Sequence, residues 1–528
     1  MFSAASLKYL GGIRTPHETT TDVNYQPNSY PSWGALNDGT GFGGRPFALD
    51  LERHEFVLGT RYSRVARLQM IDPVMHTEDV NALPVAPYVT MTMVGVSGPS
   101  TLNDPPQTDM SWFEIMASLD PTNTSQGGFI PYGTDKLITS GQNYYDANGN
   151  QIRTAFIAKW PAASPATAYD SERTPFYTFG DIQQGLVAGY FTPIPPKWRT
   201  LLKGDMLQGN ASLPIITRGS AGPCASSFHV ADVLAASVKA HPLAAYPPTH
   251  WVSRYAKDLI ELWKRQPRLA EEPIPITFLV GYPSGHWMPG HPWDNINADD
   301  IYGMATQITG MSIIGDTIVF VGSHGYGTPC YGNGTSDPNL AGTVGPDGEI
   351  YCYDPTSSAK ANHAYPYRLQ VWHYPLAQLA EVAAGNADPW SMVPEWFELE
   401  LPFVREDSII NGCAYDPTTK RFYLNVYGAD GYGYEPGPVI YVYEYTGDDP
   451  DPPDPPPIDH TCTDPDCLAQ IEELESRVLS LESQLAAAAA DLVESANRFT
   501  AITTEAEGIT QHTARILELS GAGDTTHE

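Results

Sequence analysis

The sequence predicts a mainly β protein: a β-propeller of six or seven blades, followed by a proline-rich linker and a C-terminal α-helical coiled coil. Three observations predict this class. The 528 residues include 48 prolines and 46 glycines, which interrupt helices and mark turns. Short runs rich in β-branched and aromatic residues recur along residues 1–447, each after a turn. Residues 462–528 instead carry apolar side chains at heptad spacing.

The body, residues 1–447, reads as a series of antiparallel meanders. The clearest unit has strands expected at residues 413–417, 422–427 and 439–445, with a tight turn at the sequence Asp-Pro-Thr-Thr. Four similar units precede it. Their strands are expected at residues 47–50, 56–59 and 65–70; 128–131, 137–140 and 154–160; 206–208, 213–217 and 226–230; and 311–314, 317–322, 349–353 and 367–373.

Residues 87–93 and 274–280 predict one or two further meanders, which gives six or seven units. Each unit then has roughly 64 to 75 residues, more than the roughly 40 to 50 of compact propeller blades, and long Gly/Pro loops account for the surplus. A propeller is preferred because radial packing gives each meander a neighbour on both faces. The alternative is a β-sandwich or jelly roll with insertions.

The linker, residues 448–461, contains the sequence DDPDPPDPPPID. Consecutive prolines favour an extended polyproline II conformation, and the aspartates between them keep it solvated. This segment therefore predicts a semi-rigid spacer between the body and the C-terminal segment.

The C-terminal segment, residues 462–528, predicts an oligomerisation stalk, because an apolar strip this narrow needs a partner helix to be buried. Its heptad register runs without a break from Ile471 at position a to Thr513. A long amphipathic helix packed on its own body is the alternative, against which the proline spacer argues. The expected core residues are Ile471, Leu474, Val478, Leu481, Leu485, Leu492, Phe499, Ile502, Ile509 and Ile516.

The number of helices in the stalk follows from the residues at positions a and d. β-branched residues at a with Leu at d in the first two heptads favour a dimer, whereas Ile at d further along favours three or four helices. We prefer a homotrimer and keep the dimer as the alternative.

Six cysteines occur in the chain. The four in the body, at positions 224, 330, 352 and 413, are expected to be buried free thiols. Cys467 falls at position d of the heptad register, and Cys462 lies five residues earlier. Interchain disulfides and plain thiols both remain open for this pair, and a metal site is the least favoured because C-x4-C is not a strong zinc spacing.

The net charge of −32 argues against nucleic-acid binding and against attraction to anionic membranes. Residues 448–528 hold 18 Asp or Glu and three Lys or Arg, so nearly half of the charge lies in the linker and stalk. Residues 1–16 do not predict a secretion signal, and no stretch reaches 18 apolar residues, so no membrane insertion is expected.

The densest polar group in the body lies at residues 285–300. Trp287 and Trp293 could stack on a sugar ring. The side chains that could ligate a metal are His286, His291, Asp294, Asp299 and Asp300. We interpret the segment first as a turn-rich connection between blades, then as a ligand-contacting loop, and last as a metal or catalytic site.

Three further observations concern enzyme chemistry. Ser323 and His324 lack the Gly-x-Ser-x-Gly motif of serine hydrolases. Glu395, Glu398 and Glu400 read as a surface strand, although paired carboxylates for glycoside cleavage need only meet in space. No cofactor and no metal are expected, since the common nucleotide, zinc and calcium motifs are absent from the sequence.

The order of a β body, a proline hinge and a coiled coil resembles β-propeller structural proteins of tailed bacteriophage particles, such as tail or head fibres. The residues behind the resemblance are the runs Gly-Phe-Ile-Pro at 128–131 and Cys-Ala-Tyr-Asp-Pro-Thr-Thr-Lys-Arg-Phe-Tyr-Leu at 413–424. It covers the whole chain as a plan and includes no diagnostic motif. The resemblance implies a virion component, assembled in the host cytoplasm, that displays a propeller on a stalk.

The expected function is therefore a non-enzymatic fibre or appendage protein that serves host-surface adhesion or docking to other virion proteins. Its expected partners are its own copies, other virion proteins, and a host surface glycan or receptor. The alternative is a surface glycan depolymerase, a hydrolase or lyase carried on the virion, and a cellular propeller scaffold is the third hypothesis.

Overall fold

The computed structural model divides the chain into two units, Met1–Pro453 and Asp454–Glu528. The division falls inside the predicted linker. The predicted linker and stalk lie outside the described residues, so the coiled coil, its core positions and the pair Cys462 and Cys467 stay predictions. The structure describes residues 2–15, 46–59, 64–93, 124–143, 154–160, 177–210, 220, 222–236, 273–283, 286, 288, 306–430 and 437–447.

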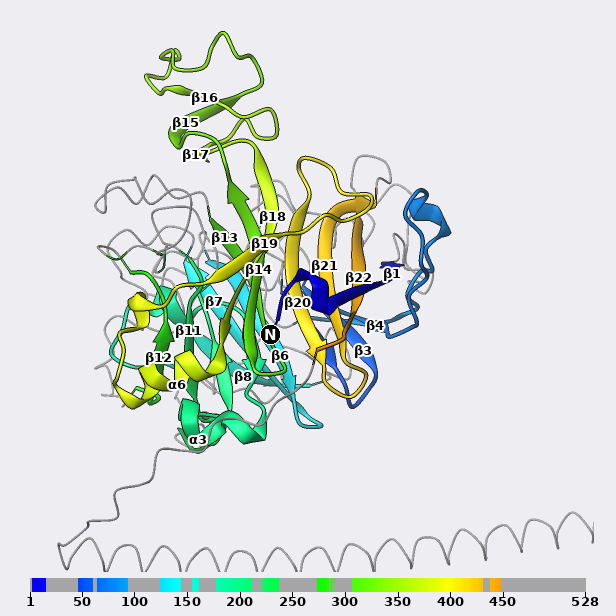
Figure 1. Cartoon of the computed structure of the whole chain (residues 1–528), viewed down its shortest axis with the longest axis vertical. Helices are drawn as coiled ribbons and strands as arrows, with labels where there is room; N and C mark the ends of the chain where they lie inside the picture. The colour runs from blue at the N-terminus through cyan, green and yellow to red at the C-terminus, as the bar shows by residue number, and fades with distance from the viewer. Residues whose placement is uncertain are drawn as a thin grey trace, which may run out of the picture. The chain divides into compact units, whose positions relative to one another are not determined.

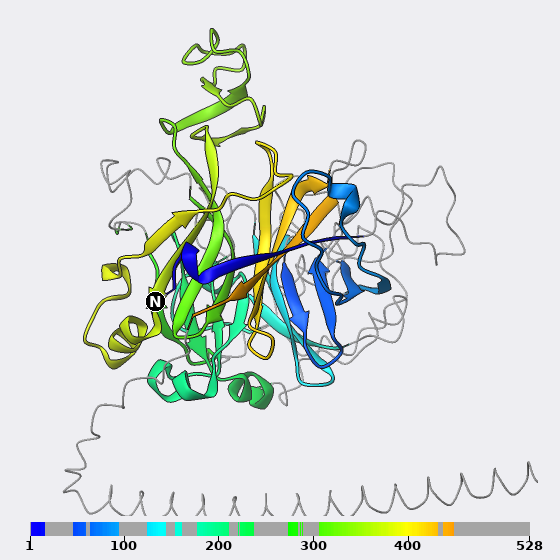
Figure 2. The same cartoon turned by 45° about the vertical axis from the view of Figure 1, so that its right-hand side comes forward.

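The prediction of a mainly β protein is confirmed. Of the described residues, 48% lie in strands and 13% in helices. The strands of the described residues form six small sheets, none of which closes on itself. Five of these sheets make up the body, and the sixth projects from it (Figures 1 and 2).

The five body sheets are antiparallel meanders, and the strands of each are given below in the order in which they pair. The first is β2 (Phe47–Asp50), β3 (Glu55–Gly59), β4 (Arg64–Gln69) and β5 (Tyr88–Met93). The second is β6 (Thr124–Tyr132), β7 (Lys136–Asn143) and β8 (Ala155–Lys159). The third is β9 (Phe191–Pro193), β10 (Met206–Gln208), β11 (Ala225–Phe228) and β12 (Thr277–Val280).

The fourth and fifth sheets complete the body. The fourth is β13 (Gln307–Ile314), β14 (Thr317–Gly325), β18 (Tyr367–Pro375) and β19 (Glu395–Glu398). The fifth is β20 (Ile409–Asp416), β21 (Arg421–Asp430), β22 (Gly437–Tyr445) and β1 (Leu7–Arg14). Its last strand therefore comes from the other end of the chain, with Leu7 opposite Tyr445.

The first strands of the five sheets contact one another in a cyclic order. β2 contacts β6, β6 contacts β9, β9 contacts β13, β13 contacts β20, and β20 contacts β2. Apolar cores fill the spaces between sheets. One core combines the third and fourth sheets, another the fourth and fifth, another the fifth and first, and another the second and third. A strand that lies between two of these cores is therefore buried on both faces. β14 is one example, which explains its unbroken apolar run at Ile318–Val321.

Glycines allow the first strands to approach closely at the centre. A Cβ added to Gly310 in β13 would lie 2.7 Å from the backbone nitrogen of Cys413 in β20. A Cβ added to Gly412 would lie 2.9 Å from the Cβ of Phe47 in β2. Each of these glycines follows an irregularity in strand register, after Ile308 and after Ile410. A larger residue at either glycine would push neighbouring sheets apart.

The first and second sheets are also joined by polar contacts. The indole Nε1 of Trp160 donates a hydrogen bond of 2.9 Å to buried Asp50, and the guanidinium of Arg67 lies 5.6 Å from the Trp160 ring centroid. The Arg67 guanidinium in turn forms a buried ion pair with Glu55 at 2.7 Å.

Short helices cap the ends of the sheets. In the described part of the chain the α-helices are α3 (Arg199–Leu202), α4 (Val230–Ala236) and α6 (Leu376–Ala384). The 3-10 helices are Ala4–Ser6, Val80–Ala82, Gln184–Val187, Pro196–Trp198 and Pro389–Ser391. α6 ends at Gly385, whose φ of 82° suits the left-handed helix cap, and buries Leu376 and Leu379 in the core between the third and fourth sheets.

Most of the predicted body strands are confirmed, but two interpretations are wrong. Residues 87–93 and 274–280 are not further meanders. They contribute β5 and β12, the fourth strands of the first and third sheets. The expected strand at residues 349–353 does not join the fourth sheet, in which β14 pairs directly with β18. The expected strand at residues 213–217 lies outside the described residues.

Candidate recognition module

Residues 326–366 form a small unit inserted between β14 and β18, which we call the projecting module. β14 and β18 pair without interruption up to Gly325 and Tyr367, so the insertion begins where their pairing ends. Its base is closed by backbone hydrogen bonds of 2.8 Å from Tyr326 to Pro366 and from Gly327 to Ala364. The module extends beyond the ends of the body strands in both views (Figures 1 and 2).

The sheet of the module has three strands: β15 (Cys330–Thr335) in the centre, β16 (Tyr351–Tyr353) parallel to it and β17 (Lys360–His363) antiparallel. Two glycines in β15 explain how the chain crosses it. A Cβ on Gly332 would lie 2.0 Å from the carbonyl oxygen of Ile350, and a Cβ on Gly334 would lie 1.7 Å from that of Ser357. Because Gly332 and Gly334 alternate with larger residues in Cys-Tyr-Gly-Asn-Gly-Thr, one face of β15 carries no side chain at these two positions, and neighbouring backbone can pack directly against it.

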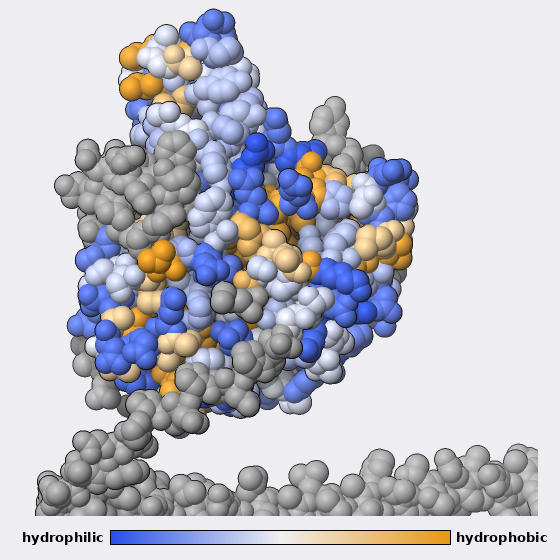
Figure 3. Space-filling view, viewed as in Figure 1, coloured by the Kyte–Doolittle hydropathy of each residue, from blue (hydrophilic) through white to orange (hydrophobic). Residues whose placement is uncertain are grey.

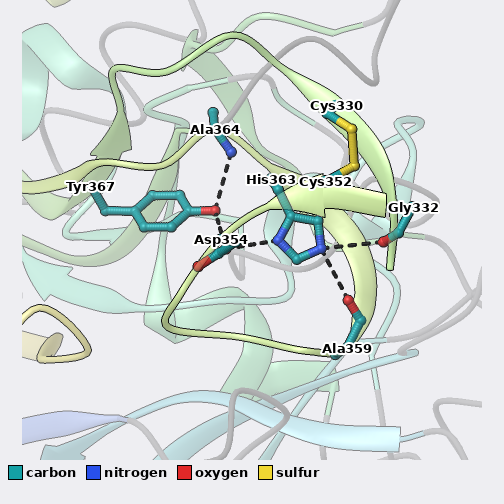
Figure 4. The surroundings of a disulfide bond; sticks show 8 residues. All are labelled: Cys330, Gly332, Cys352, Asp354, Ala359, His363, Ala364 and Tyr367. Carbon is teal, nitrogen blue, oxygen red and sulfur yellow. Dashed lines mark hydrogen bonds and ion pairs between the residues drawn. A yellow bond between two sulfur atoms is a disulfide. The ribbon is translucent and has the colours of Figure 1, made fainter. Parts of the chain in front are cut away.

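A disulfide between Cys330 and Cys352 joins β15 to β16 (Figure 4). Their Cα atoms are 5.7 Å apart, a usual separation for a disulfide. The expectation that all four body cysteines are free thiols is therefore wrong for this pair. It is confirmed for Cys224 and Cys413, which are free and buried.

A buried polar network holds the other side of the module together (Figure 4). Asp354 and His363 are each only 2% exposed, and the Nδ1 of His363 lies 2.7 Å from a carboxylate oxygen of Asp354. The same oxygen accepts a hydrogen bond of 2.9 Å from the Tyr367 hydroxyl. The other carboxylate oxygen accepts bonds from the backbone NH and the hydroxyl of Thr356, at 2.9 and 2.6 Å.

The second ring nitrogen of His363 decides the role of this pair. Its Nε2 lies 3.0 Å from the carbonyl oxygen of Ala359 and 3.2 Å from that of Gly332. Carbonyl oxygens only accept hydrogen bonds, so Nε2 carries a proton and is not free to act as a base toward a nucleophile. An Asp–His pair of this kind braces the fold, whereas a catalytic dyad needs the second nitrogen directed at a reacting group.

The environment shifts two pKa values in the network. Burial raises the pKa of Asp354, but the hydrogen bonds from His363, Thr356 and Tyr367 outweigh it and hold the pKa below the usual 3.8. Burial, followed by the proximity of Asp354, raises the pKa of the Tyr367 hydroxyl, which therefore stays protonated and donates. Both effects keep Asp354 as a carboxylate surrounded by donors.

The outer surface of the module exposes apolar side chains, which Figure 3 shows among hydrophilic ones. Val344 and Ile350 face each other across an isolated β-bridge. Lys360 in β17 forms an ion pair of 2.7 Å with Glu349, the residue before Ile350, and lies 5.7 Å from the Tyr331 ring centroid. The large apolar residues and their exposed fractions are Leu340 (41%), Val344 (67%), Ile350 (45%) and Tyr353 (42%).

Of the five residues predicted to form a ligand loop, the structure describes His286. Its ring stacks on Trp390, with centroids 4.2 Å apart and an interplanar angle of 25°. Trp287, His291, Trp293 and Asp294 lie outside the described residues, so the loop stays a prediction.

Two other groups weighed for catalysis are described. The Nδ1 of His324 lies 2.8 Å from the hydroxyl of Thr306, and both residues are buried. The carboxylate of Glu395 lies 3.8 Å from His373, and that of Glu398 lies 4.0 Å from Arg368. In the part of the chain that the structure describes, no three His, Cys, Asp or Glu residues form a group that could hold a metal ion.

The sequence contains a feature that could have predicted the projecting module: the length and composition of the segment between two neighbouring strands. The strands expected at 317–322 and 367–373 are neighbours, yet 44 residues separate them, and these include two cysteines and a Gly-x-Gly alternation. A long, cysteine-containing segment between paired strands indicates an inserted unit.

No protein-family model matches the chain, and neither does any curated protein. Among the described residues, no helix has both the length and the apolar character needed to cross a membrane.

Proposed function

We propose that the protein is a non-enzymatic structural component of a phage particle, an oligomeric fibre or appendage protein that displays β-propeller heads on a coiled-coil stalk. In this proposal the heads serve host-surface adhesion or docking to other virion proteins. The stalk is the heptad segment at residues 462–528, and its acidic surface keeps an elongated support solvated.

The body in this proposal is a propeller of five blades, in place of the six or seven expected from length. Its support is the cyclic contact of β2, β6, β9, β13 and β20, together with the cores between successive sheets. A further support is β1, which completes the last blade from the other end of the chain and so ties the first and last blades together.

The observation that carries the function is the projecting module. It presents Leu340, Val344, Ile350 and Tyr353 to solvent on a scaffold fixed by a disulfide and by the buried hydrogen-bonded pair of Asp354 and His363. Exposed apolar side chains on a rigid support are typical of protein–protein recognition surfaces. His363 is committed to backbone carbonyls, which favours recognition over catalysis at this site.

The proposal is tested on particles. Virions are purified from the producing host by density gradient, and their proteins are identified by mass spectrometry. We expect peptides of this chain to co-purify with the particles, and we expect added purified chain to reduce particle adsorption to host cells. Absence of the chain from the particles would refute the proposal. Release of new reducing ends from host surface glycans by the purified chain would favour the depolymerase instead.

A further inference from the structure

The projecting module has little apolar packing of its own. None of the residues 326–366 belongs to any of the hydrophobic core clusters of the described body. Its buried residues are instead the disulfide cysteine Cys352, the pair Asp354 and His363, and the small residues Gly332, Gly334 and Ala364. A unit held by so little apolar burial opens independently of the sheets beneath it, because local opening free energies follow local packing.

The free cysteines of the body are protected from oxidation. Cys224 is 0% exposed and donates a hydrogen bond to the Leu186 carbonyl oxygen, and Cys413 lies in the core between the fourth and fifth sheets. Burial raises the pKa of both thiols, so that the reactive thiolate form is suppressed. Among the described cysteines, thiol chemistry is therefore confined to the module.

We propose that the bond between Cys330 and Cys352 is a redox switch: the module is open while the two thiols are reduced and assumes its folded recognition surface when they are oxidised. This inference rests on the proposed function, because that function assigns recognition to the module. A particle assembled in a reducing cytoplasm would carry the open form, and the oxidising exterior would close it.

The switching step is thiol–disulfide exchange with a small disulfide such as oxidised glutathione. Cys330, the more exposed of the two, attacks as its thiolate, forms a mixed disulfide and releases one glutathione. The thiolate of Cys352 then displaces the second glutathione and closes the protein disulfide. Two protons and two electrons pass from the protein thiols to the two glutathione molecules, so the exchange is balanced.

The size of the effect follows from the loop that the bond closes. Cys330 and Cys352 are 22 residues apart, and a disulfide closing a loop of that length shifts the opening equilibrium by roughly 300-fold. In the reduced form the module is held by non-covalent contacts alone: the pairing of β15 with β16 and β17, the hydrogen bonds around Asp354 and His363, and those at its base. We therefore expect amide exchange in β15, β16 and β17 to accelerate on the order of 100-fold on reduction.

The experiment measures hydrogen–deuterium exchange by mass spectrometry on the full chain, oxidised and reduced. We expect reduction, or the double variant Cys330→Ser with Cys352→Ser, to deprotect residues 326–366 and to leave β20, β21 and β22 unchanged. Cys224→Ala is the matched control, and its module should keep its protection while oxidised. Unchanged protection of the module on reduction, or loss of protection across the body sheets at the same time, would overturn the inference.

A binding measurement distinguishes a failure of the redox switch from a failure of the proposed function. The oxidised and reduced full chains are compared for binding to cells of the producing host. Loss of binding on reduction supports the gating of recognition. Equal binding in both forms overturns it, even where exchange shows that the module opens. Failure of the oxidised chain to bind counts against adhesion as the function, whereas the exchange data still decide whether the switch exists.

Discussion

Replacing His363 tests whether the buried pair braces the module. His363→Ala leaves the carboxylate of Asp354, which is 2% exposed, without its hydrogen bond to the imidazole Nδ1. Losing a hydrogen bond to a charged group costs about 1.5 to 3 kcal/mol. The two carbonyl oxygens that contact Nε2 lose their partner as well, so we expect the upper end, about 3 kcal/mol, which corresponds to about a 100-fold rise in local opening.

Hydrogen–deuterium exchange of the oxidised full chain measures this opening directly. The amides of β15 and β17 should exchange about 100-fold faster in the variant, while those of β21 and β22 keep their protection. The control is His229→Ala, which removes an exposed histidine and should change neither region. If β15 and β17 exchange at the same rate with and without His363, or if the sheets of the body lose protection to the same extent, His363 does not hold the module together.

Three further predictions concern the pair, the centre of the body and the contact between its first two sheets. The Asp354 carboxylate contributes stability above pH 3.8, its usual pKa, and this stability is lost as pH falls through the lower pKa that Asp354 has in the folded protein. The opening of the module, measured by amide exchange and corrected for the intrinsic exchange rate, should therefore rise below about pH 4. An equally steep rise in the variant Asp354→Asn would contradict this. Gly310→Ala should lower the free energy of unfolding by at least about 2 kcal/mol, because its Cβ would lie 2.7 Å from the Cys413 nitrogen; an unchanged denaturant midpoint would show that β13 and β20 are not this close. Trp160→Phe should cost about 1.5 to 3 kcal/mol by removing a hydrogen bond to the buried carboxylate of Asp50, as measured by denaturant unfolding, and a cost under about 0.5 kcal/mol would argue against that contact.

The local structure of the body was largely predictable, but its long-range pairing was not. Runs such as 317–322 and 439–445 are rich in β-branched and aromatic residues, and they form β14 and β22. β1 was not predicted, because its sequence, LKYLGGIR, contains two glycines and because the strand with which it pairs, β22, is not adjacent to it in the sequence. Its ion pair from Lys8 to Glu444 joins residues 436 positions apart, and local sequence pattern contains no information about such a separation.

The candidate site was missed for a related reason. Asp354 and His363 lie in a segment rich in Gly, Ser and Asn, which predicts a solvated loop, yet both are buried. What buries them is the close crossing of β15 at Gly332 and Gly334, a property of tertiary structure. The disulfide depends likewise on a Cα separation of 5.7 Å that spacing in sequence does not determine.

The central claim is that this β body is displayed in several copies by its C-terminal heptads. Native mass spectrometry of the full chain tests it most directly, because each chain has a mass of 57.6 kDa. We expect a homotrimer of about 173 kDa, three times the mass of one chain, that dissociates when Ile471 and Leu474 are both replaced by Asp. A monomer of 57.6 kDa at micromolar concentration would contradict it.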